Sequence, residues 1–205
     1  MIPGAVLLAT RNVGKLREMR LILGPLNARL LDLDEAGIPP HAEEEGLEQF
    51  ETFEENAVAK GRYFFAASGL PTVADDSGLV IPALGGRPGV RSKRWSGRPE
   101  LSGHALDDAN NARLVASLAG ISDRRAAYVC VAVFVDGART VVTRGETDGT
   151  IVDSPSGTRG FGYDPYFRST ELRGTFSECA DVEKARVSHR GRALRALVRE
   201  LTQSG

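Results

Sequence analysis

The chain has 205 residues, of which 41% are hydrophobic and 26% are charged, so it is long enough to bury a sizeable core. Its formal net charge of −1 provides no overall basic field, and we expect no nucleic-acid polymer as a partner. The first apolar run, Ala5 to Ala9, is too short for a secretion signal or a membrane span, which predicts a cytoplasmic protein with no membrane partner. Cys130 and Cys179 are too few for a disulfide framework or a metal cluster.

Hydrophobic periodicity and turn residues predict strands and helices along the whole chain. Because no repeat or linker is present, residues 1–205 are expected to form one α/β domain with a mixed sheet flanked by helices. A capping box at Thr52 and Glu55 and a two-residue hairpin turn at Asp136-Gly137 are the strongest local signals. In chain order we expect a strand at 5–9, a turn at 10–15, a helix ending at Gly24-Pro25, a helix from Thr52 to 69, a strand at 71–74, extended structure at 79–81, a helix at 103–118, strands at 126–135 and 140–143, a strand at 149–152, and a helix with Ser188 as its N-cap.

The first chemical pattern is Thr10-Arg-Asn-Val-Gly-Lys15, between the first strand and the first helix. Free backbone N–H groups and the helix dipole attract phosphate at such a position, and Lys15 would add a positive charge. A plain strand-to-helix turn with a solvated Lys15 is the alternative, because Gly14 is a single glycine and the pattern is not a Walker loop.

The second pattern is Asp75-Asp76-Ser77-Gly78, after an apolar strand. Ligand sites in open α/β sheets collect at strand ends, and paired carboxylates there indicate a hard cation. Neighbouring side chains of an extended chain point to opposite faces, so only one aspartate should face the site. We predict that it is Asp76, with Ser77 as a donor to a phosphate. An acidic turn is the alternative.

An acidic stretch with seven glutamates between residues 43 and 55 precedes this pattern. Most of these side chains are expected on a solvated face. One of them would nevertheless complete a Mg²⁺ site, because this ion is held by one or two carboxylates together with water and substrate phosphate. Lys60 follows Asn56 by one helical turn, and it points either at the same phosphates or at Asn56 or a glutamate.

The third pattern, Gly160-Phe-Gly-Tyr-Asp-Pro165, frames two aromatic residues with glycines. An aromatic face can stack on a purine, and Asp164 can accept a hydrogen bond from a base N–H. A loop that packs its own aromatic residues on the core is the alternative.

The fourth pattern is Lys184 followed by Ser188-His189-Arg190, at the first turn of the final helix. Donors from His189, Arg190 and the open backbone N–H groups would suit an oxygen of a base or a phosphate. A capped surface helix with incidental charges is the alternative.

Taken in order, these segments resemble the inosine triphosphate pyrophosphatase family, which acts on non-canonical purine triphosphates. The resemblance covers nearly the whole chain. It is carried by Ala9-Thr-Arg-Asn-Val-Gly-Lys15, Thr52-Phe-Glu-Glu-Asn-Ala57 with Lys60, Ala74-Asp-Asp-Ser-Gly-Leu79, Leu84-Gly-Gly-Arg-Pro-Gly-Val90, Gly160-Phe-Gly-Tyr-Asp-Pro165 and Ser188-His-Arg190.

The resemblance implies an elongated α/β protein of two lobes, with the active site in the cleft between them, that works as a homodimer with Mg²⁺. The implied reaction is hydrolysis of ITP, dITP, XTP or dXTP to the monophosphate and pyrophosphate, with Asp76 as the metal-linked general base. The implied substrate contacts are Thr10, Arg11, Asn12, Val13, Gly14, Lys15, Lys60 and Ser77, and, around the base and sugar, Phe161, Gly162, Tyr163, Asp164, Lys184, His189 and Arg190.

The second metal ligand is implied by a Glu-x-Gly-x-Thr-Phe stretch of the family, which corresponds here to Glu48, although Phe50 stands at the glycine position. Glu45 and, further away, Glu35 are the alternatives. Arg91 stands where many members have tyrosine, and we assign residues 91–95 no catalytic role. Two other functions are weighed against this one: a pyrophosphatase for other modified nucleotides, like the related Maf proteins, and a non-catalytic nucleotide-binding module.

Overall fold

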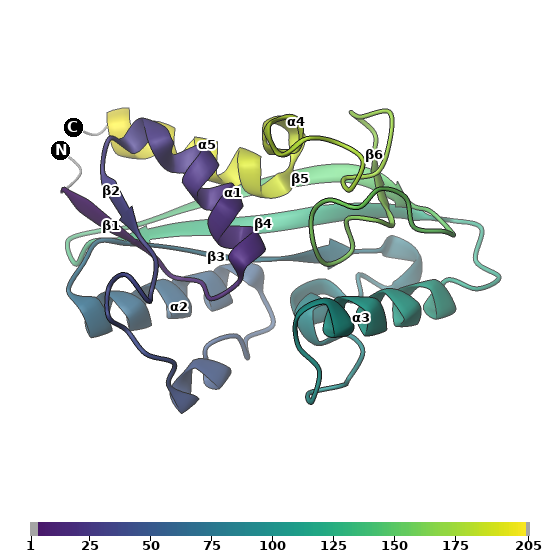
Figure 1. Cartoon of the computed structure of the whole chain (residues 1–205), viewed down its shortest axis with the longest axis horizontal. Helices are drawn as coiled ribbons and strands as arrows, with labels where there is room; N and C mark the ends of the chain where they lie inside the picture. The colour runs from purple at the N-terminus through teal and green to yellow at the C-terminus, as the bar shows by residue number, and fades with distance from the viewer. Residues whose placement is uncertain (1–3, 204–205) are drawn as a thin grey trace. The chain divides into compact units, whose positions relative to one another are not determined.

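The computed structural model describes residues 4–203, and within them it contains one mixed six-stranded sheet with the order β2-β1-β3-β4-β5-β6 (Figure 1). The pairs β1–β2 and β1–β3 are parallel, and the pair β5–β6 is antiparallel. The predicted α/β class is therefore confirmed. The strands are β1 (Ala5–Leu8), β2 (Arg29–Leu31), β3 (Thr72–Val80), β4 (Arg125–Val135), β5 (Thr140–Ile151) and β6 (Phe167–Ser169), and the α-helices are α1 (Val13–Leu23), α2 (Phe53–Ser68), α3 (Gly103–Ser117), α4 (Asp181–Val187) and α5 (His189–Gln203).

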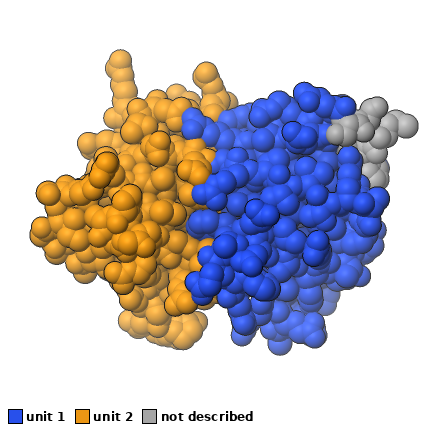
Figure 2. All heavy atoms as spheres, turned by 180° about the vertical axis from the view of Figure 1, so that it is seen from behind, with its two compact units in different colours: residues 1–76, 130–145, 189–205 blue, residues 77–129, 146–188 orange. Residues whose placement is uncertain are grey.

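The chain divides into two compact units, which Figure 2 shows in different colours. The boundaries between the units fall inside β3, β4 and β5, so these three strands contribute residues to both. That the chain forms one domain stays a prediction. Unit 1 consists of Met1–Asp76, Cys130–Gly145 and His189–Gly205, and unit 2 consists of Ser77–Val129 and Glu146–Ser188.

In unit 1, α1 and α5 lie on one face of the sheet and α2 covers the other (Figure 1). Helix α2 begins after Thr52, whose hydroxyl accepts a hydrogen bond from the Glu55 backbone N–H and donates one to the Glu55 carboxylate. The N-cap half of the predicted capping box is therefore confirmed. The helix ends at Gly69, which has the left-handed φ of 68° that favours glycine at this position.

In unit 2, aromatic side chains make up much of the apolar core. Tyr128, Phe167 and Phe176 contact one another, with ring centroids 4.7 to 5.9 Å apart. Trp95, which follows the short 3-10 helix η4 (Gly89–Arg94), belongs to the same core, and the Arg113 guanidinium lies 4.4 Å from its ring centroid. Among the helices of residues 4–203, none combines the length and the hydropathy that a membrane crossing requires.

Two predicted strand boundaries are wrong, because sheet pairing overrides local turn preference. Asp75-Asp76-Ser77-Gly78 does not end a strand: it lies inside β3, which is flanked by β1 and β4 in the sheet. Similarly, the strands expected at 140–143 and 149–152 are parts of the single strand β5. From Arg144 to Ile151, this strand alternates mostly between exposed and buried positions, as expected for a strand with one covered face.

Two further corrections concern a turn and a helix. The hairpin turn is formed by Gly137-Ala138 rather than Asp136-Gly137. Asp136 is the residue before the turn, and its carboxylate stabilises the turn by accepting hydrogen bonds from the backbone N–H groups of Ala138 and Arg139. Gly137 takes the left-handed φ of 84°. Helix α4 was not predicted, and Lys184 lies on it rather than on the first turn of the final helix.

Candidate active site

The loop after β1 lies beside the two aspartates of β3. β1 ends at Leu8, which pairs with Val73, whereas β3 continues to Val80. The Ala9 backbone N–H donates to the Val73 carbonyl at 2.8 Å, so the chain enters the turn at the level of Asp75. Because β1 ends before its parallel neighbour β3, the first turn of α1 lies next to the part of β3 that extends beyond β1.

The turn itself is an ordinary helix N-terminus. Asn12 is the N-cap of α1, and its Oδ1 accepts a hydrogen bond from the Lys15 backbone N–H at 3.0 Å. The Thr10 hydroxyl accepts another from the Asn12 backbone N–H at 3.2 Å. Arg11 points away to the acidic stretch, where its Nη2 lies 2.7 Å from Glu44. The positive end of the helix dipole lies at this turn and favours an anion there.

Asp75 is the centre of a buried charge cluster in unit 1. Its Oδ2 lies 3.1 Å from Lys15 Nζ and 3.0 Å from Arg190 Nε. Nη1 of Arg190 also donates to Glu18 at 2.5 Å, and Arg190 is only 2% exposed. Burial by itself raises the pKa of Asp75, but Lys15 and Arg190 outweigh burial and hold this pKa well below its ordinary value.

Asp76 makes its contacts with a different element. Its Oδ2 accepts a hydrogen bond from Asn56 of α2 at 3.0 Å, whereas Asp75 contacts α1 and α5. The expected alternation of the two carboxylates is therefore confirmed. Burial, with a smaller contribution from Glu48, raises the pKa of Asp76 above its ordinary value, although Lys15 and Lys60 oppose this shift. A carboxylate with a raised pKa is a better proton acceptor.

Asn56 ties the acidic stretch to Asp76. It is fully buried, its Oδ1 accepts from the Phe50 backbone N–H at 2.9 Å, and its Nδ2 donates to Asp76. From the sequence, Asn56 was expected only as a possible partner of Lys60. Lys60 binds Glu48, with 2.5 Å between Nζ and Oε1, which is the alternative pairing with a glutamate. The net effect of the surrounding carboxylates is to raise the pKa of Lys60, even though burial lowers it.

The three candidate metal ligands differ in their surroundings. Glu48 forms an ion pair with Lys60, and its negative charge contributes to raising the pKa of Asp76. Glu45 is exposed, and Glu35 binds Arg20 at 2.6 Å. Among the described residues, no three or more His, Cys, Asp or Glu side chains are grouped to hold a metal ion. Because Mg²⁺ commonly takes only one or two protein carboxylates, the oxygen donors of Asp76 and Glu48 fit this ion.

In unit 2, Asp164 closes the glycine-framed loop. Its Oδ2 accepts a hydrogen bond from the Phe161 backbone N–H at 2.9 Å and lies 2.5 Å from Lys184 Nζ. Gly160 and Gly162 have left-handed φ values of 79° and 62°, and a Cβ atom on Gly160 would collide with the Asp164 carboxylate. Asp164 as an acceptor for a base N–H stays a prediction.

The two aromatic residues of this loop have different environments. Tyr163 is 4% exposed, and its hydroxyl donates to the Ser92 carbonyl at 2.7 Å. Tyr163 therefore belongs to the core, where its ring is covered by protein, and its contact with a base stays a prediction. Phe161 is half-buried, with Lys184 Nζ 4.9 Å from its ring centroid. Only Phe161 of the pair offers a partly open ring.

The turn between α4 and α5 is largely buried. Ser188 has an extended backbone, and its N–H donates to the Lys184 carbonyl at 2.8 Å. His189 is buried at the start of α5, and two nitrogens of the Arg190 guanidinium donate to Glu18 and Asp75. The predicted contacts of His189 and Arg190 with a nucleobase stay predictions.

Three side chains near these patterns were not singled out from the sequence: Glu18, Asp107 and Asn111. Glu18 follows Lys15 by three residues on α1, a spacing that places both on one helix face and that could have been noticed. Asp107 and Asn111 contact Gly162, which lies 55 and 51 residues further along the chain, and no local signal indicates this contact.

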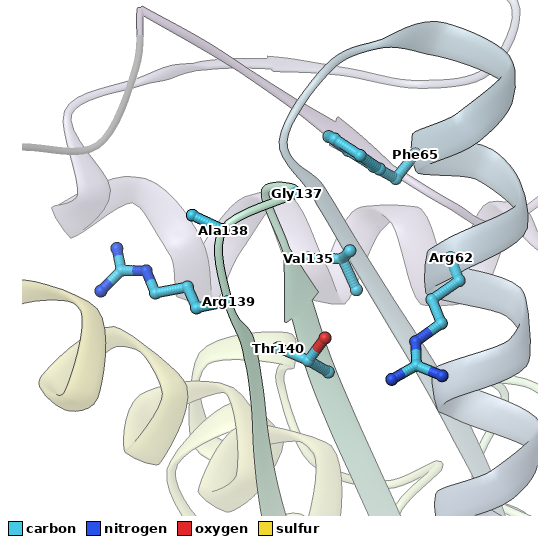
Figure 3. Close-up of a pocket in the computed structure, with 7 residues that line it drawn as sticks. All are labelled: Arg62, Phe65, Val135, Gly137, Ala138, Arg139 and Thr140. Carbon is cyan, nitrogen blue, oxygen red and sulfur yellow. The ribbon is translucent and has the colours of Figure 1, made fainter.

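A pocket of about 330 Å³ lies elsewhere in unit 1, between α2 and the turn that joins β4 to β5 (Figure 3). In the close-up, Arg62 and Phe65 project from α2 toward the hairpin. None of the candidate site residues lines this pocket. Its lining consists of Arg62, Phe65, Val135, Gly137, Ala138, Arg139 and Thr140.

A helix N-terminus, two lysines and paired carboxylates around β3 are groups that can bind a phosphate-bearing substrate. The chain belongs to the Ham1 family, whose model matches residues 6–200. It is 45% identical over 200 residues to a protein of Ralstonia nicotianae named dITP/XTP pyrophosphatase, covering 96% of each chain. A protein of the same name from Geobacter sulfurreducens is 45% identical over 203 residues, covering 98% of each.

The fold is also similar to that of a solved relative. The structure of a HAM1 protein from Coxiella burnetii matches with a TM-score of 0.82 and 35% sequence identity. The match covers 99% of this chain and 100% of that protein. The family resemblance that the sequence motifs indicated is therefore confirmed.

Proposed function

We propose that this protein hydrolyses non-canonical purine nucleoside triphosphates, of the ITP, dITP, XTP and dXTP type, to the monophosphate and pyrophosphate. This reaction would remove them from the nucleotide pool before they enter DNA or RNA. The observation that carries the proposal is the cluster of Asp76, Glu48, Lys60 and Lys15 in unit 1. The similarity to proteins named dITP/XTP pyrophosphatase supports the choice of substrate.

In the proposed reaction, water attacks the phosphorus next to the ribose, and pyrophosphate leaves. Asp76 accepts the proton of the attacking water as the general base. Lys15, Lys60 and the N-terminus of α1 neutralise the charge on the leaving pyrophosphate. The phosphates would compete with Asp75 and Glu48, which hold these two lysines in the structure.

We propose Mg²⁺ as the cofactor, with Asp76 and Glu48 as its protein ligands. When bound, the ion supplies charge neutralisation and orientation of the phosphates. Asn56 would keep the Asp76 carboxylate in place, and Lys60 holds that of Glu48. We further propose that the enzyme is a homodimer and acts in the cytoplasm.

Selection of the base is assigned to Phe161 and Lys184 of unit 2. The Phe161 ring would stack on the purine. Hypoxanthine and xanthine carry an oxygen at position six where adenine carries an amino group, so a donor to that oxygen would discriminate against ATP. A site built around such a hydrogen bond discriminates by roughly 10⁴–10⁵-fold. Arg190 is assigned first to holding Asp75, because its guanidinium is bound there.

The test is pyrophosphate release with and without Mg²⁺ from a panel of ITP, XTP, GTP, ATP and modified pyrimidine triphosphates. We expect Mg²⁺-dependent release that is fastest with ITP and XTP. Preference for a modified pyrimidine would indicate a Maf-like pyrophosphatase instead. Binding of ITP without release of pyrophosphate would reduce the protein to a nucleotide-binding module and overturn the proposal.

A further inference from the structure

Helix α3 holds the backbone of Gly162 at both of its hydrogen-bonding groups. Asp107 Oδ2 accepts from the Gly162 N–H at 2.8 Å, and Asn111 Nδ2 donates to the Gly162 carbonyl at 2.9 Å. Asp107 and Asn111 lie one helical turn apart, so they share one face of α3. We call this arrangement the Gly162 clamp.

The clamp acts on a glycine-rich segment whose Phe161 backbone N–H is also held, by Asp164. Gly160 and Gly162 both have left-handed φ values, and glycine has more backbone freedom than any other residue. On the C-terminal side, Tyr163 is already anchored by its buried ring and by its hydroxyl, which binds the Ser92 carbonyl. On the N-terminal side, Phe161 is only half-buried. Since Gly162 directly follows Phe161, holding the Gly162 peptide adds to the Asp164 contact in fixing where the Phe161 ring points.

The neighbouring residue on α3 makes equivalent contacts with a different segment. Asn110 Oδ1 accepts from the Ser96 backbone N–H at 2.7 Å, and its Nδ2 donates to the Lys93 carbonyl at 3.1 Å. Asn110 and Asn111 are almost equally buried, with exposed fractions of 4% and 6%. The two asparagines differ in what they hold: Asn110 holds the end of η4, and Asn111 holds the Gly162 peptide.

We propose that Asp107 and Asn111 are positioning residues for base recognition, which preset the Phe161 ring for stacking on the purine. This inference rests on the proposed function. Because every base has a π-face, stacking alone does not discriminate between purines, so the ring would select by fixing where position six of the stacked purine lies relative to its donor. The inference gives α3 no part in the phosphate chemistry. Because Asp107 is the partner of a backbone N–H, an amide oxygen in its place can still accept the same hydrogen bond.

The test compares Asn111→Ala and Asp107→Ala with the matched control Asn110→Ala. For the first two variants we expect KM for ITP to rise about five- to tenfold, the effect of losing one hydrogen bond, with a much smaller change in kcat. The ratio of kcat/KM between ITP and ATP should narrow. Asp107→Asn should keep KM for ITP close to the wild-type value, unlike Asp107→Ala. Asn110→Ala should lower the melting temperature to a similar extent and leave the ratio unchanged.

A second measurement does not depend on turnover. Hydrogen exchange of the segment 160–166 should accelerate in Asn111→Ala and Asp107→Ala but not in Asn110→Ala, whether or not ITP is hydrolysed. If Asn111→Ala does not fold, Asn111→Asp keeps the volume and removes the donor. If the ratio of kcat/KM between ITP and ATP narrowed equally in Asn110→Ala and Asn111→Ala, the inference would be overturned. An inactive wild-type protein with the expected exchange pattern would instead overturn the proposed function.

Discussion

Lys15 of α1 and Asp75 of β3 form a close ion pair, with 3.1 Å between Nζ and Oδ2. The same carboxylate oxygen accepts a hydrogen bond from Arg190 of α5. The lysine that the sequence assigns to phosphate binding is thus held by a fully buried carboxylate that is not itself assigned to the substrate. Asp75 therefore sets the position of Lys15, and it does so as part of the core of unit 1.

Replacing Asp75 by Asn should lower the free energy of unfolding by about 3–5 kcal/mol near neutral pH, because Lys15 and Arg190 would lose a buried counter-charge. The pKa of Asp75 is lowered by folding, so its stabilisation is complete above the ordinary aspartate pKa and is lost as the pH falls toward the lowered value. Urea unfolding of both proteins should therefore show a constant difference above about pH 5 that shrinks below about pH 4. A difference that does not shrink in acid would contradict this account.

Replacing Asp76 by Asn should reduce kcat by about 10²–10⁴-fold, because it removes the proton acceptor without changing the volume of the side chain. Stability should be unchanged or slightly higher, since the substitution removes a buried charge whose pKa is raised by burial. Pyrophosphate release and thermal unfolding measure the two effects. Near-normal turnover in Asp76→Asn would remove Asp76 from the role of general base.

Replacing Glu48 by Gln should raise the Mg²⁺ concentration needed for half-maximal activity. Glu45→Gln and Glu35→Gln are the matched controls, because Glu45 is exposed and Glu35 is bound to Arg20. Magnesium titrations of the three variants at saturating ITP test whether Glu48→Gln has the largest effect. A larger shift in either control than in Glu48→Gln would assign the metal ligand elsewhere.

Replacing Lys15 by Ala should lower kcat/KM by a similar factor for ITP, XTP, GTP and ATP, because all four carry the same phosphates. The comparison variant is Arg190→Ala, which leaves Asp75 and Glu18 without their shared cation and should lower stability. If Arg190 also contacts the base, as the sequence predicts, the ratio of kcat/KM for ITP to kcat/KM for ATP must narrow in Arg190→Ala and stay unchanged in Lys15→Ala. A substrate-dependent effect of Lys15→Ala would contradict its role in phosphate binding.

Local features were predictable because a few neighbouring residues encode them. The capping interaction of Thr52 with Glu55 involves only groups within one helical turn, and the buried strand β4 is indicated by its own β-branched residues. The order of the motifs was enough to indicate the family, since each motif is short and contiguous. The alternation of Asp75 and Asp76 follows from the geometry of any extended chain.

The partners of the buried polar groups were decided by the tertiary structure. Asp75 meets Arg190 across 115 residues of sequence, and Asn111 meets Gly162 across 51. Tyr163 and Phe161 are the two aromatic residues of one motif, but the core packed around Tyr163 covers its ring. The sequence by itself determined which side chains can carry charge, donate or stack. Only the packing of α1, α5 and α3 decided which of them bind partners inside the protein, because a buried polar group must take whichever partner the fold brings within hydrogen-bonding distance.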